Sequence, residues 1–312
     1  MAYQGNQNLR SANEKIVYTP EMKKEFIRCY SDIIHFGEEY CHIITIDEGK
    51  VKIKFWDFQK RMIKAMYDPP EYRNVEGQME KKKFLIVLSP RQVGKTTVSA
   101  VYLTHYAIFN EHKTIAILAN KEKTALEILS RIKMIYEGLP LWLQPGIVDG
   151  GWNKQSITLG NGSRIIATST ASSAIRGYTI NSLFLDEFAF VPPQIAEEFM
   201  NSVYPTVSSG KTSKIIIVST PNGMNHFYNI WIDAIRGKNS YFPVKINWWE
   251  VPGRDDNFKK EIIRNQGITS WNQEYNCNAG ESIINIRNKE NGLIKSVSCD
   301  ELWKYGNKIF DK

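Results

Sequence analysis

Short, continuous runs of apolar residues recur along the middle of the chain, and a segment of helical periodicity follows each of them. Because the runs show no alternation of apolar and polar positions, each is typical of a parallel strand that is covered on both faces. The pattern predicts an α/β fold with a mainly parallel sheet flanked by helices. The predicted strands are 84–88, 114–119, 182–185 and 214–219, and the predicted helices are 98–109, 121–137, 194–203 and 224–236.

The rest of the chain is less regular. We expect helices over 21–40 and 57–66, a hairpin or two short strands over 42–46 and 51–55, a surface loop over 71–83, and a hairpin that joins 156–159 to 164–168 around Gly160-Asn161-Gly162. We place the core domain at residues 51–247. A small, mainly helical subdomain would combine residues 1–50 with residues 248–312, which also hold the tail.

Composition narrows the class of protein. The chain has 312 residues, 42% of them hydrophobic and 23% charged, which fits a globular protein. The N-terminus is polar and no apolar run is long enough for a membrane span, so we expect an intracellular protein without membrane contact. Four scattered cysteines and the lack of CxxC and HExxH motifs give no support to a disulfide scaffold or a zinc site. The net charge of +7 is compatible with a nucleic-acid partner, but many proteins of this size are mildly basic without one.

The segment after the first apolar run fits the phosphate-binding loop GxxxxGK[ST], except that serine occupies the first position. Such a loop presents main-chain N–H groups and the positive end of a helix to a triphosphate. Here Gly94 would allow close approach, Lys95 would reach the β- and γ-phosphates, and Thr96 would ligate Mg²⁺. The sequence therefore predicts a nucleotide site built from Ser89, Pro90, Arg91, Gln92, Val93, Gly94, Lys95, Thr96 and Thr97.

A second apolar run ends in two acids, Asp186 and Glu187. This pattern, downstream of a phosphate loop and separated from it by strands, is typical of a Walker B segment. Asp186 would hold Mg²⁺ through water, and Glu187 would orient and deprotonate the attacking water. The two segments together predict an NTP hydrolase that uses ATP and Mg²⁺.

Five further residues, the last two of them adjacent, have two possible interpretations each. Gln59 could read the adenine edge, with Phe55 or Trp56 over the base, or it could be a surface glutamine on an amphipathic helix. Arg91 could reach the γ-phosphate or pair with a loop carboxylate. Arg176 could act as a finger toward a neighbouring subunit's nucleotide, or be a solvated loop charge. Ser219 and Thr220 could sense the γ-phosphate, although the following Pro-Asn-Gly is also a strong turn sequence.

Three segments, 89–97, 184–190 and 219–228, resemble the large terminase subunits of tailed bacteriophages, especially those of T-even-like myophages. The resemblance extends over about residues 50–282. It implies a P-loop NTPase of the ASCE/RecA-like kind that hydrolyses ATP and drives double-stranded DNA into a procapsid. It also implies a homo-oligomeric ring on the portal protein, a small terminase subunit as partner, and a location in the host cytoplasm and transiently at the portal vertex.

The resemblance assigns roles to single residues. It implies Gln59 as the adenine-reading glutamine, Lys95 and Thr96 as the Walker A pair, Arg91 as the Walker A arginine, Asp186 as the magnesium-side acid, Glu187 as the catalytic base, Ser219 and Thr220 as the coupling motif, and Arg176 as a candidate trans-acting finger. Large terminases usually continue into an RNase H-like nuclease domain. Only 32 residues follow Gly280, so we expect this chain to hydrolyse ATP without cutting DNA.

Two other functions remain open at this point. A helicase-like ATPase shares the glutamine, Walker A and Walker B layout, but it needs a second RecA-like domain, which does not fit after Gly280. A nucleotide-gated scaffold would bind the portal or the small terminase and hydrolyse little ATP by itself.

Overall fold

The computed structural model describes residues 2–170, 175, 177–277, 283–287 and 294–298. An eight-stranded sheet lies at its centre, in the order β14-β7-β13-β12-β8-β11-β10-β9. Neighbours from β14 to β11 pair in parallel, whereas β10 and β9 extend the sheet antiparallel, so the prediction of a mainly parallel sheet is confirmed. The strands are β7 (Phe84–Leu88), β8 (Thr114–Ala119), β9 (Ile147–Trp152), β10 (Ser156–Leu159), β11 (Arg164–Ser169), β12 (Ser182–Asp186), β13 (Lys214–Ser219) and β14 (Tyr241–Lys245).

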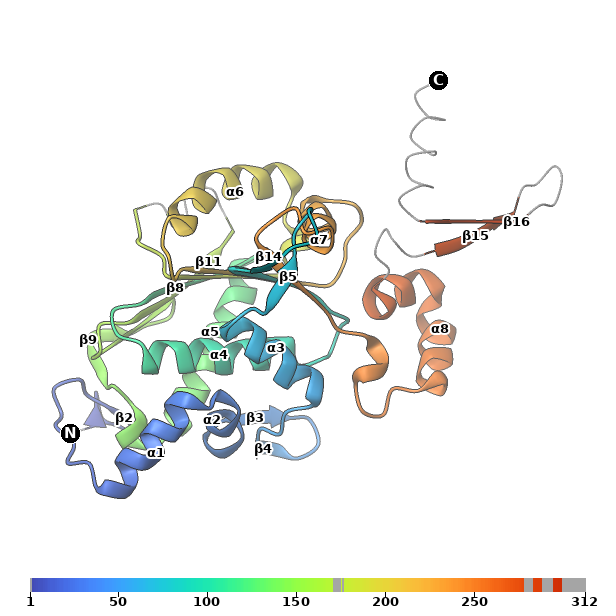
Figure 1. The fold of residues 1–312 in the computed structure, drawn as a ribbon. Coiled ribbons are helices and arrows are strands. Elements are labelled where there is room, and N and C mark those ends of the chain that lie inside the picture. Colours follow the sequence, from blue (N-terminus) through green and yellow to red (C-terminus); the bar gives the residue numbers. More distant parts are fainter. Residues whose placement is uncertain (1, 171–174, 176, 278–282, 288–293, 299–312) are drawn as a thin grey trace.

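Helices cover both faces of this sheet, as expected. The helices α3 (Asp57–Tyr67), α4 (Lys95–Phe109) and α5 (Glu122–Gly138) lie on one face, and α6 (Pro193–Ser208) and α7 (His226–Ile235) lie on the other (Figure 1). In β7, Leu85 and Val87 belong to the first core and Ile86 and Leu88 to the second. Both faces of the strand are therefore buried, which explains its uninterrupted apolar sequence.

The predicted helix over 21–40 is two helices, α1 (Pro20–Ser31) and α2 (Ile33–Tyr40). Asp32 ends the first and caps the second, since its carboxylate accepts hydrogen bonds from the main-chain N–H groups of Ile34 and His35. An aspartate in such a position competes with the helical backbone, so the chain turns there although the apolar spacing continues.

These two helices pack against the main body of the protein. Phe36 of α2 contacts the rings of His105 and Phe109 on α4 and shares one core with Leu85 of the sheet. That packing gives no support to a separate subdomain made of residues 1–50 and the C-terminal segment. The remaining N-terminal elements are β1 (Ala2–Tyr3), β2 (Asn6–Arg10) and the hairpin β3 (His42–Thr45) and β4 (Gly49–Lys52), which was predicted.

The prediction of a surface loop over residues 71–83 is wrong. Two short strands, β5 (Glu71–Arg73) and β6 (Met79–Lys81), form a hairpin there. The carboxamide of Asn74 accepts hydrogen bonds from the N–H groups of Glu76 and Gln78 and so organises the turn. Tyr72 packs edge-to-face on Phe242, at 5.8 Å between ring centroids. A long-range contact thus fixes strands whose own sequence is polar.

Strands β9 and β14 form the two edges of the sheet. Strand β9 was not predicted, because Asp149, Gly150 and Gly151 interrupt its apolar pattern, yet it pairs with β10. At the opposite edge, β14 pairs with β7 and contains Pro243 opposite Ile86. Short 3-10 helices connect other elements: η1 (Leu141–Leu143), η2 (Phe188–Phe190) and η3 (Trp248–Glu250).

The C-terminal part of the described chain lies to one side of the sheet (Figure 1). Helix α8 (Asp256–Trp271) and the π-helical turn η4 (Asn272–Asn276) enclose a small core of Trp248, Trp271 and Tyr275. An antiparallel hairpin of β15 (Ile283–Arg287) and β16 (Ile294–Ser298) follows.

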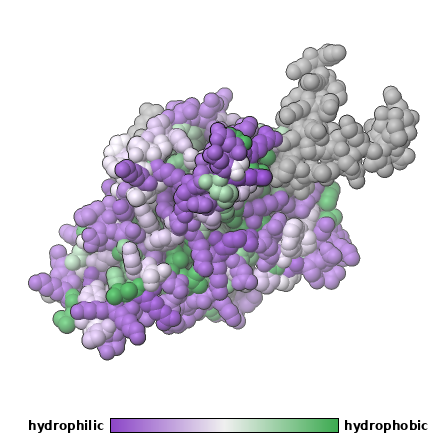
Figure 2. Space-filling model, viewed as in Figure 1, coloured by the Kyte–Doolittle hydropathy of each residue, from purple (hydrophilic) through white to green (hydrophobic). Residues whose placement is uncertain are grey.

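The face shown in Figure 2 is largely hydrophilic, with hydrophobic residues in small groups. Within the described residues, we find no helix with the length and apolar character that a membrane crossing requires.

Candidate nucleotide-binding site

The carboxyl ends of three neighbouring strands bring the predicted motifs together. Strands β7, β13 and β12 are adjacent and parallel, with Leu88 opposite Ser219 and Val218 opposite Asp186. Just beyond them, the Ser89 N–H donates to the Ser219 carbonyl at 3.1 Å, and the Glu187 N–H donates to the Val218 carbonyl at 2.9 Å. The phosphate-loop segment, the acidic pair and the Ser219-Thr220 segment therefore share one edge of the sheet, where open α/β sheets bind ligands.

The loop between β7 and α4 has an unusual backbone. Gln92 and Gly94 have φ values of 57° and 72°, in the left-handed region. A Cβ atom on Gly94 would lie 2.6 Å from Nε2 of Gln59, so both the backbone conformation and the lack of space call for glycine. Gly94 caps α4, and within the described part of the chain no side-chain cap bonds to the first-turn N–H groups of that helix. These donors, at Lys95, Thr96 and Thr97, are available to an anion.

Gln59 holds this loop. Its Oε1 accepts from the Trp56 N–H at 3.1 Å, and its Nε2 donates to the Val93 carbonyl at 3.0 Å. Gln59 and Val93 are buried, whereas Trp56 is 37% exposed beside the start of α3. The structure thus brings Gln59 to the phosphate loop, and the main chain of Trp56 holds the Gln59 carboxamide in place. Phe55, which we considered as a cover for the base, is 4% exposed and belongs to the main core, so it is not available for stacking.

A lysine and a glutamate form the centre of the site. Nζ of Lys95 donates to Oε1 of Glu187 at 2.5 Å, and Oγ1 of Thr220 donates to Oε2 of the same carboxylate at 3.4 Å. Glu187 has a φ of 53°, a conformation that costs energy for a residue with a side chain and that often marks functional sites. Ser219 is buried, and its hydroxyl accepts from the Ala189 N–H just after Glu187.

Asp186 lies deeper, at the tip of β12, and is only 3% exposed. Burial raises its pKa to about 6, and the Glu187 carboxylate adds to this, while the Lys95 ammonium acts in the opposite direction. Its Oδ1 is buried and has no hydrogen-bond partner among the described residues, and the same holds for Oγ of Ser89. An orphaned carboxylate oxygen at this position is a suitable ligand for a hard divalent cation or for a water molecule bound to it.

Arg91 points to the C-terminal segment. Its Nε lies 2.5 Å from Oε2 of Glu274, and its main-chain N–H donates to the Glu274 carbonyl. Of the two interpretations that the sequence left open, this structure displays pairing with a carboxylate, but Glu274 belongs to the π-helical turn η4 and not to a loop.

Arg254 was missed by the sequence analysis. Its Nη2 donates to the carbonyls of both Arg91 and Gln92, at 3.0 and 3.1 Å, and its guanidinium lies over the rings of Phe258 and Tyr275. The C-terminal segment thereby supports the phosphate loop from outside. No local signal could have identified Arg254, because it is one arginine among many, far from the loop in sequence.

Arg131 was also missed by the sequence analysis. Its Nη1 donates to Oγ1 of Thr97.

The other predicted residues have simpler positions. Pro90 is buried beside Ser89 in the loop, and Thr96 is half-buried in the first turn of α4. Arg176 lies outside the described residues, so its predicted role stays a prediction.

Known proteins share this architecture. The large terminase of bacteriophage HK97 superposes with a TM-score of 0.62 at 17% identity, over 82% of this chain and 56% of that one. The large terminase of a thermophilic bacteriophage gives 0.53 at 13% identity, over 74% and 55%, and its complex with ATP-gamma-S gives 0.50 at 15% identity, over 71% and 52%. The chain therefore spans little more than half the length of these relatives, and the likeness shows a common fold.

A family model adds sequence evidence to this likeness. The model for the N-terminal part of the T4likevirus-type terminase large subunit matches residues 86–295, well over half of the chain. The match includes the phosphate loop, the acidic pair and the Ser219-Thr220 segment. The chain belongs to the T4likevirus-type terminase large-subunit family, of which it contains the N-terminal domain.

Proposed function

We propose that this chain is the ATPase motor domain of a viral large terminase, which hydrolyses Mg·ATP to drive double-stranded DNA into a procapsid. One observation carries the proposal. The first-turn N–H groups of α4, the Lys95–Glu187 pair and the buried Oδ1 of Asp186, which has no partner among the residues that the structure describes, meet at one edge of a parallel sheet. Family membership supports the motor role.

The phosphate loop would bind the triphosphate. The first-turn N–H groups of α4 would donate to the β- and γ-phosphates, and Lys95 would add a positive charge. Asp186 and Thr96 would hold Mg²⁺, which neutralises charge on the phosphates when it is bound. The buried Oδ1 of Asp186, for which the described residues supply no partner, fits this role.

Glu187 would act as the general base. A γ-phosphate oxygen competes with its carboxylate for the Lys95 ammonium, because both are anions within reach of the same cation. Transfer of Lys95 to the phosphate would free Glu187 to take a proton from water. The water oxygen then forms a bond to the γ-phosphorus while the bond from that phosphorus to the bridging oxygen breaks, and ADP and phosphate leave.

Thr220 is suited to couple this chemistry to movement. Its hydroxyl donates to Glu187, and Ser219 bonds to the turn that follows Glu187, so a change at the carboxylate reaches β13 directly.

Arg91 would have to exchange Glu274 for a phosphate oxygen to act in catalysis. We propose Gln59 as a reader of adenine as well as a support of the loop, and Arg176 as the finger toward a neighbouring subunit.

We also propose partners for the motor, with family membership as support. Double-stranded DNA, the portal protein and the small terminase subunit would bind an assembled ring of this chain in the host cytoplasm, at the portal vertex of the procapsid.

A steady-state ATPase assay tests the proposal. We expect the purified chain to hydrolyse Mg·ATP, procapsids with double-stranded DNA to stimulate hydrolysis, and Lys95→Ala to abolish it. Stimulation by free single strands instead would favour a helicase-like enzyme. Tight binding of ATP without hydrolysis under any of these conditions would favour a nucleotide-gated scaffold. Absence of affinity for Mg·ATP would overturn the proposal.

A further inference from the structure

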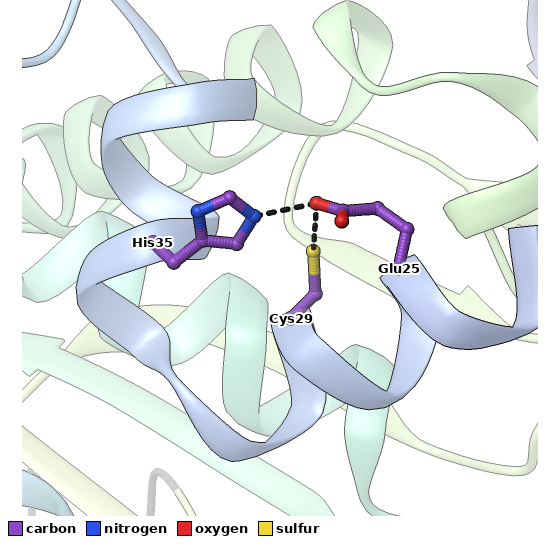
Figure 3. Close-up of side chains that lie close together, drawn as sticks. All are labelled: Glu25, Cys29 and His35. Carbon is purple, nitrogen blue, oxygen red and sulfur yellow. Dashed lines mark hydrogen bonds and ion pairs between the residues drawn. The ribbon is translucent and has the colours of Figure 1, made fainter. Parts of the chain in front are cut away.

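A thiol, an imidazole and a carboxylate meet on the first two helices, outside the nucleotide site. Glu25 and Cys29 lie one turn apart on α1, and His35 follows on α2 (Figure 3). One potential ligand atom from each, an oxygen, a sulfur and a nitrogen, lies within 4.8 Å of the other two. All three side chains point toward one another (Figure 3). The residues therefore converge although the sequence contains no recognised metal-binding motif.

The fold fixes this arrangement through the main chain. Asp32 caps α2 by accepting from the His35 N–H, which turns the second helix so that His35 faces α1. On the other side, Nε2 of His105 donates to the Cys29 carbonyl at 2.8 Å and ties the end of α1 to α4. The backbone at Cys29 and His35 is thus held by contacts that do not involve the converging side chains.

The donor atoms gather around one carboxylate oxygen. Oε1 of Glu25 lies 2.5 Å from Nε2 of His35, 3.8 Å from Sγ of Cys29 and 3.1 Å from the Tyr40 hydroxyl. Ligand atoms in a tetrahedral zinc site are about 3.5 Å apart, given bonds of about 2.0–2.3 Å. The sulfur–oxygen separation already fits that value. The nitrogen–oxygen separation must increase by about 1 Å, which rotation of the carboxylate can supply.

The site also has an entrance. Cys29 is fully buried, whereas the Glu25 side chain is 26% exposed and the His35 side chain 15% exposed. The thiol thus forms the closed end of the cluster and the carboxylate its open end. The positive charge of Arg28 would repel a cation at this site. Its Nη1 lies 4.0 Å from Oε2 of Glu25, but the arginine side chain is 63% exposed and free to turn toward solvent.

We propose that Glu25, Cys29 and His35 bind one divalent transition-metal ion, with zinc as the best match and a water molecule as fourth ligand. A set of one sulfur, one nitrogen and one oxygen suits zinc and not magnesium, which takes oxygen ligands. When the sulfur–metal bond forms, Cys29 releases its thiol proton to solvent. The ion would join α1 to α2 across the turn at Asp32 and stabilise the packing of both helices on α4.

Metal binding to the full, tag-free chain tests this inference. With ZnCl₂ in equilibrium dialysis, followed by elemental analysis, we expect one zinc ion per chain. With CoCl₂ we expect a thiolate-to-cobalt charge-transfer band in the near ultraviolet. Zinc at about 100 times its dissociation constant should raise the melting temperature by about 5 °C. No nucleotide is added, and Asp186→Asn should retain the ion, which separates this site from the magnesium position.

Three variants locate the ion. Cys29→Ser and His35→Ala should each lose the zinc ion and the cobalt band, whereas Cys277→Ser, at a buried cysteine in the other core, should keep both. Because Cys29 is buried and its variant could misfold, His35→Ala at a partly exposed position provides the independent test. Absence of zinc from the wild-type chain, or full zinc occupancy in both Cys29→Ser and His35→Ala, would overturn the proposal.

Discussion

Lys95 and Glu187 form a direct ion pair, with Nζ and Oε1 2.5 Å apart, at the edge of the sheet where the phosphate loop begins its helix. The same ammonium is the group that a phosphate loop offers to a γ-phosphate. The cation for the substrate and the proposed base are therefore linked before the substrate arrives, and a bound γ-phosphate would compete with Glu187 for this ammonium.

The pair predicts the behaviour of Glu187→Gln. The amide oxygen can still accept from Lys95, so we expect ATP binding to remain, but an amide cannot take a proton from water and turnover should fall at least about 100-fold. Nucleotide titration and steady-state kinetics measure the two effects separately. Glu198→Gln, at an exposed glutamate on α6, is the matched control and should change neither. Unchanged turnover in Glu187→Gln would contradict the assignment of the base.

Arg254→Ala should weaken ATP binding. The variant removes two hydrogen bonds from a charged donor to the carbonyls of Arg91 and Gln92, and with them a support of the loop in its left-handed conformation. Bonds of this kind contribute about 1.5–3 kcal/mol, so we expect the dissociation constant for ATP to rise at least about tenfold. Arg254→Lys should recover part of the affinity. Arg264→Ala, at an exposed arginine of helix α8, which begins just after Arg254, should bind ATP like the wild type. Equal affinity in Arg254→Ala and wild type would show that the loop does not need this support.

Gln59→Ala separates two roles of the glutamine. Since Nε2 of Gln59 bonds to the Val93 carbonyl, loss of the side chain should loosen the loop and weaken ATP and GTP to a similar degree. Competitive titration of both nucleotides measures this. Lys60→Ala, at the next position on α3, is the control. A loss confined to ATP would instead identify adenine reading as the main role of Gln59.

The stability of the protein should depend on pH through His105. Its Nε2 donates to the Cys29 carbonyl and its Nδ1 accepts from the Tyr67 hydroxyl, and burial lowers its pKa to about 4. The unfolded chain binds this proton near pH 6.5, so the contribution of His105 to stability is complete above that pH and is lost as the pH falls toward 4. Between pH 7 and pH 5 the loss is about 2 kcal/mol.

Urea unfolding at several pH values checks this expectation. His105→Gln should be less sensitive to acid over that window than the wild type, although less stable at pH 7. His112→Asn, at an exposed turn, should retain the wild-type slope. The same slope in His105→Gln and wild type would show that another group is responsible.

The elements that can be predicted from the sequence are those whose residues are fully buried. Strand β8 has the predicted bounds, since every position from Ile115 to Ala119 is buried. The hairpin of β10 and β11 was predicted because its turn residues leave few alternatives. Asp186 and Ser219 were predicted as site residues because a polar residue at the end of a run of buried apolar residues is easy to recognise in the sequence.

Long-range contacts account for what was missed. The hairpin of β5 and β6 depends on Tyr72 against Phe242, and the support of the phosphate loop depends on Arg254. In both cases the partner lies far away in sequence, and the residue itself is of an ordinary surface type. The turn at Asp32 is different, because it is local, but its carboxylate competes with a helical spacing that continues on both sides.

Pro243 in the edge strand β14 limits how the molecule can associate. The Ile246 N–H donates to the Leu88 carbonyl of β7. Because main-chain N–H groups point alternately to the two sides of a strand, the main-chain nitrogen of Pro243 points away from β7. The missing N–H thus falls on the open side, where a ninth strand would require a donor. Growth of the sheet by strand addition is disfavoured at this edge, and neighbouring copies that meet here must use side chains.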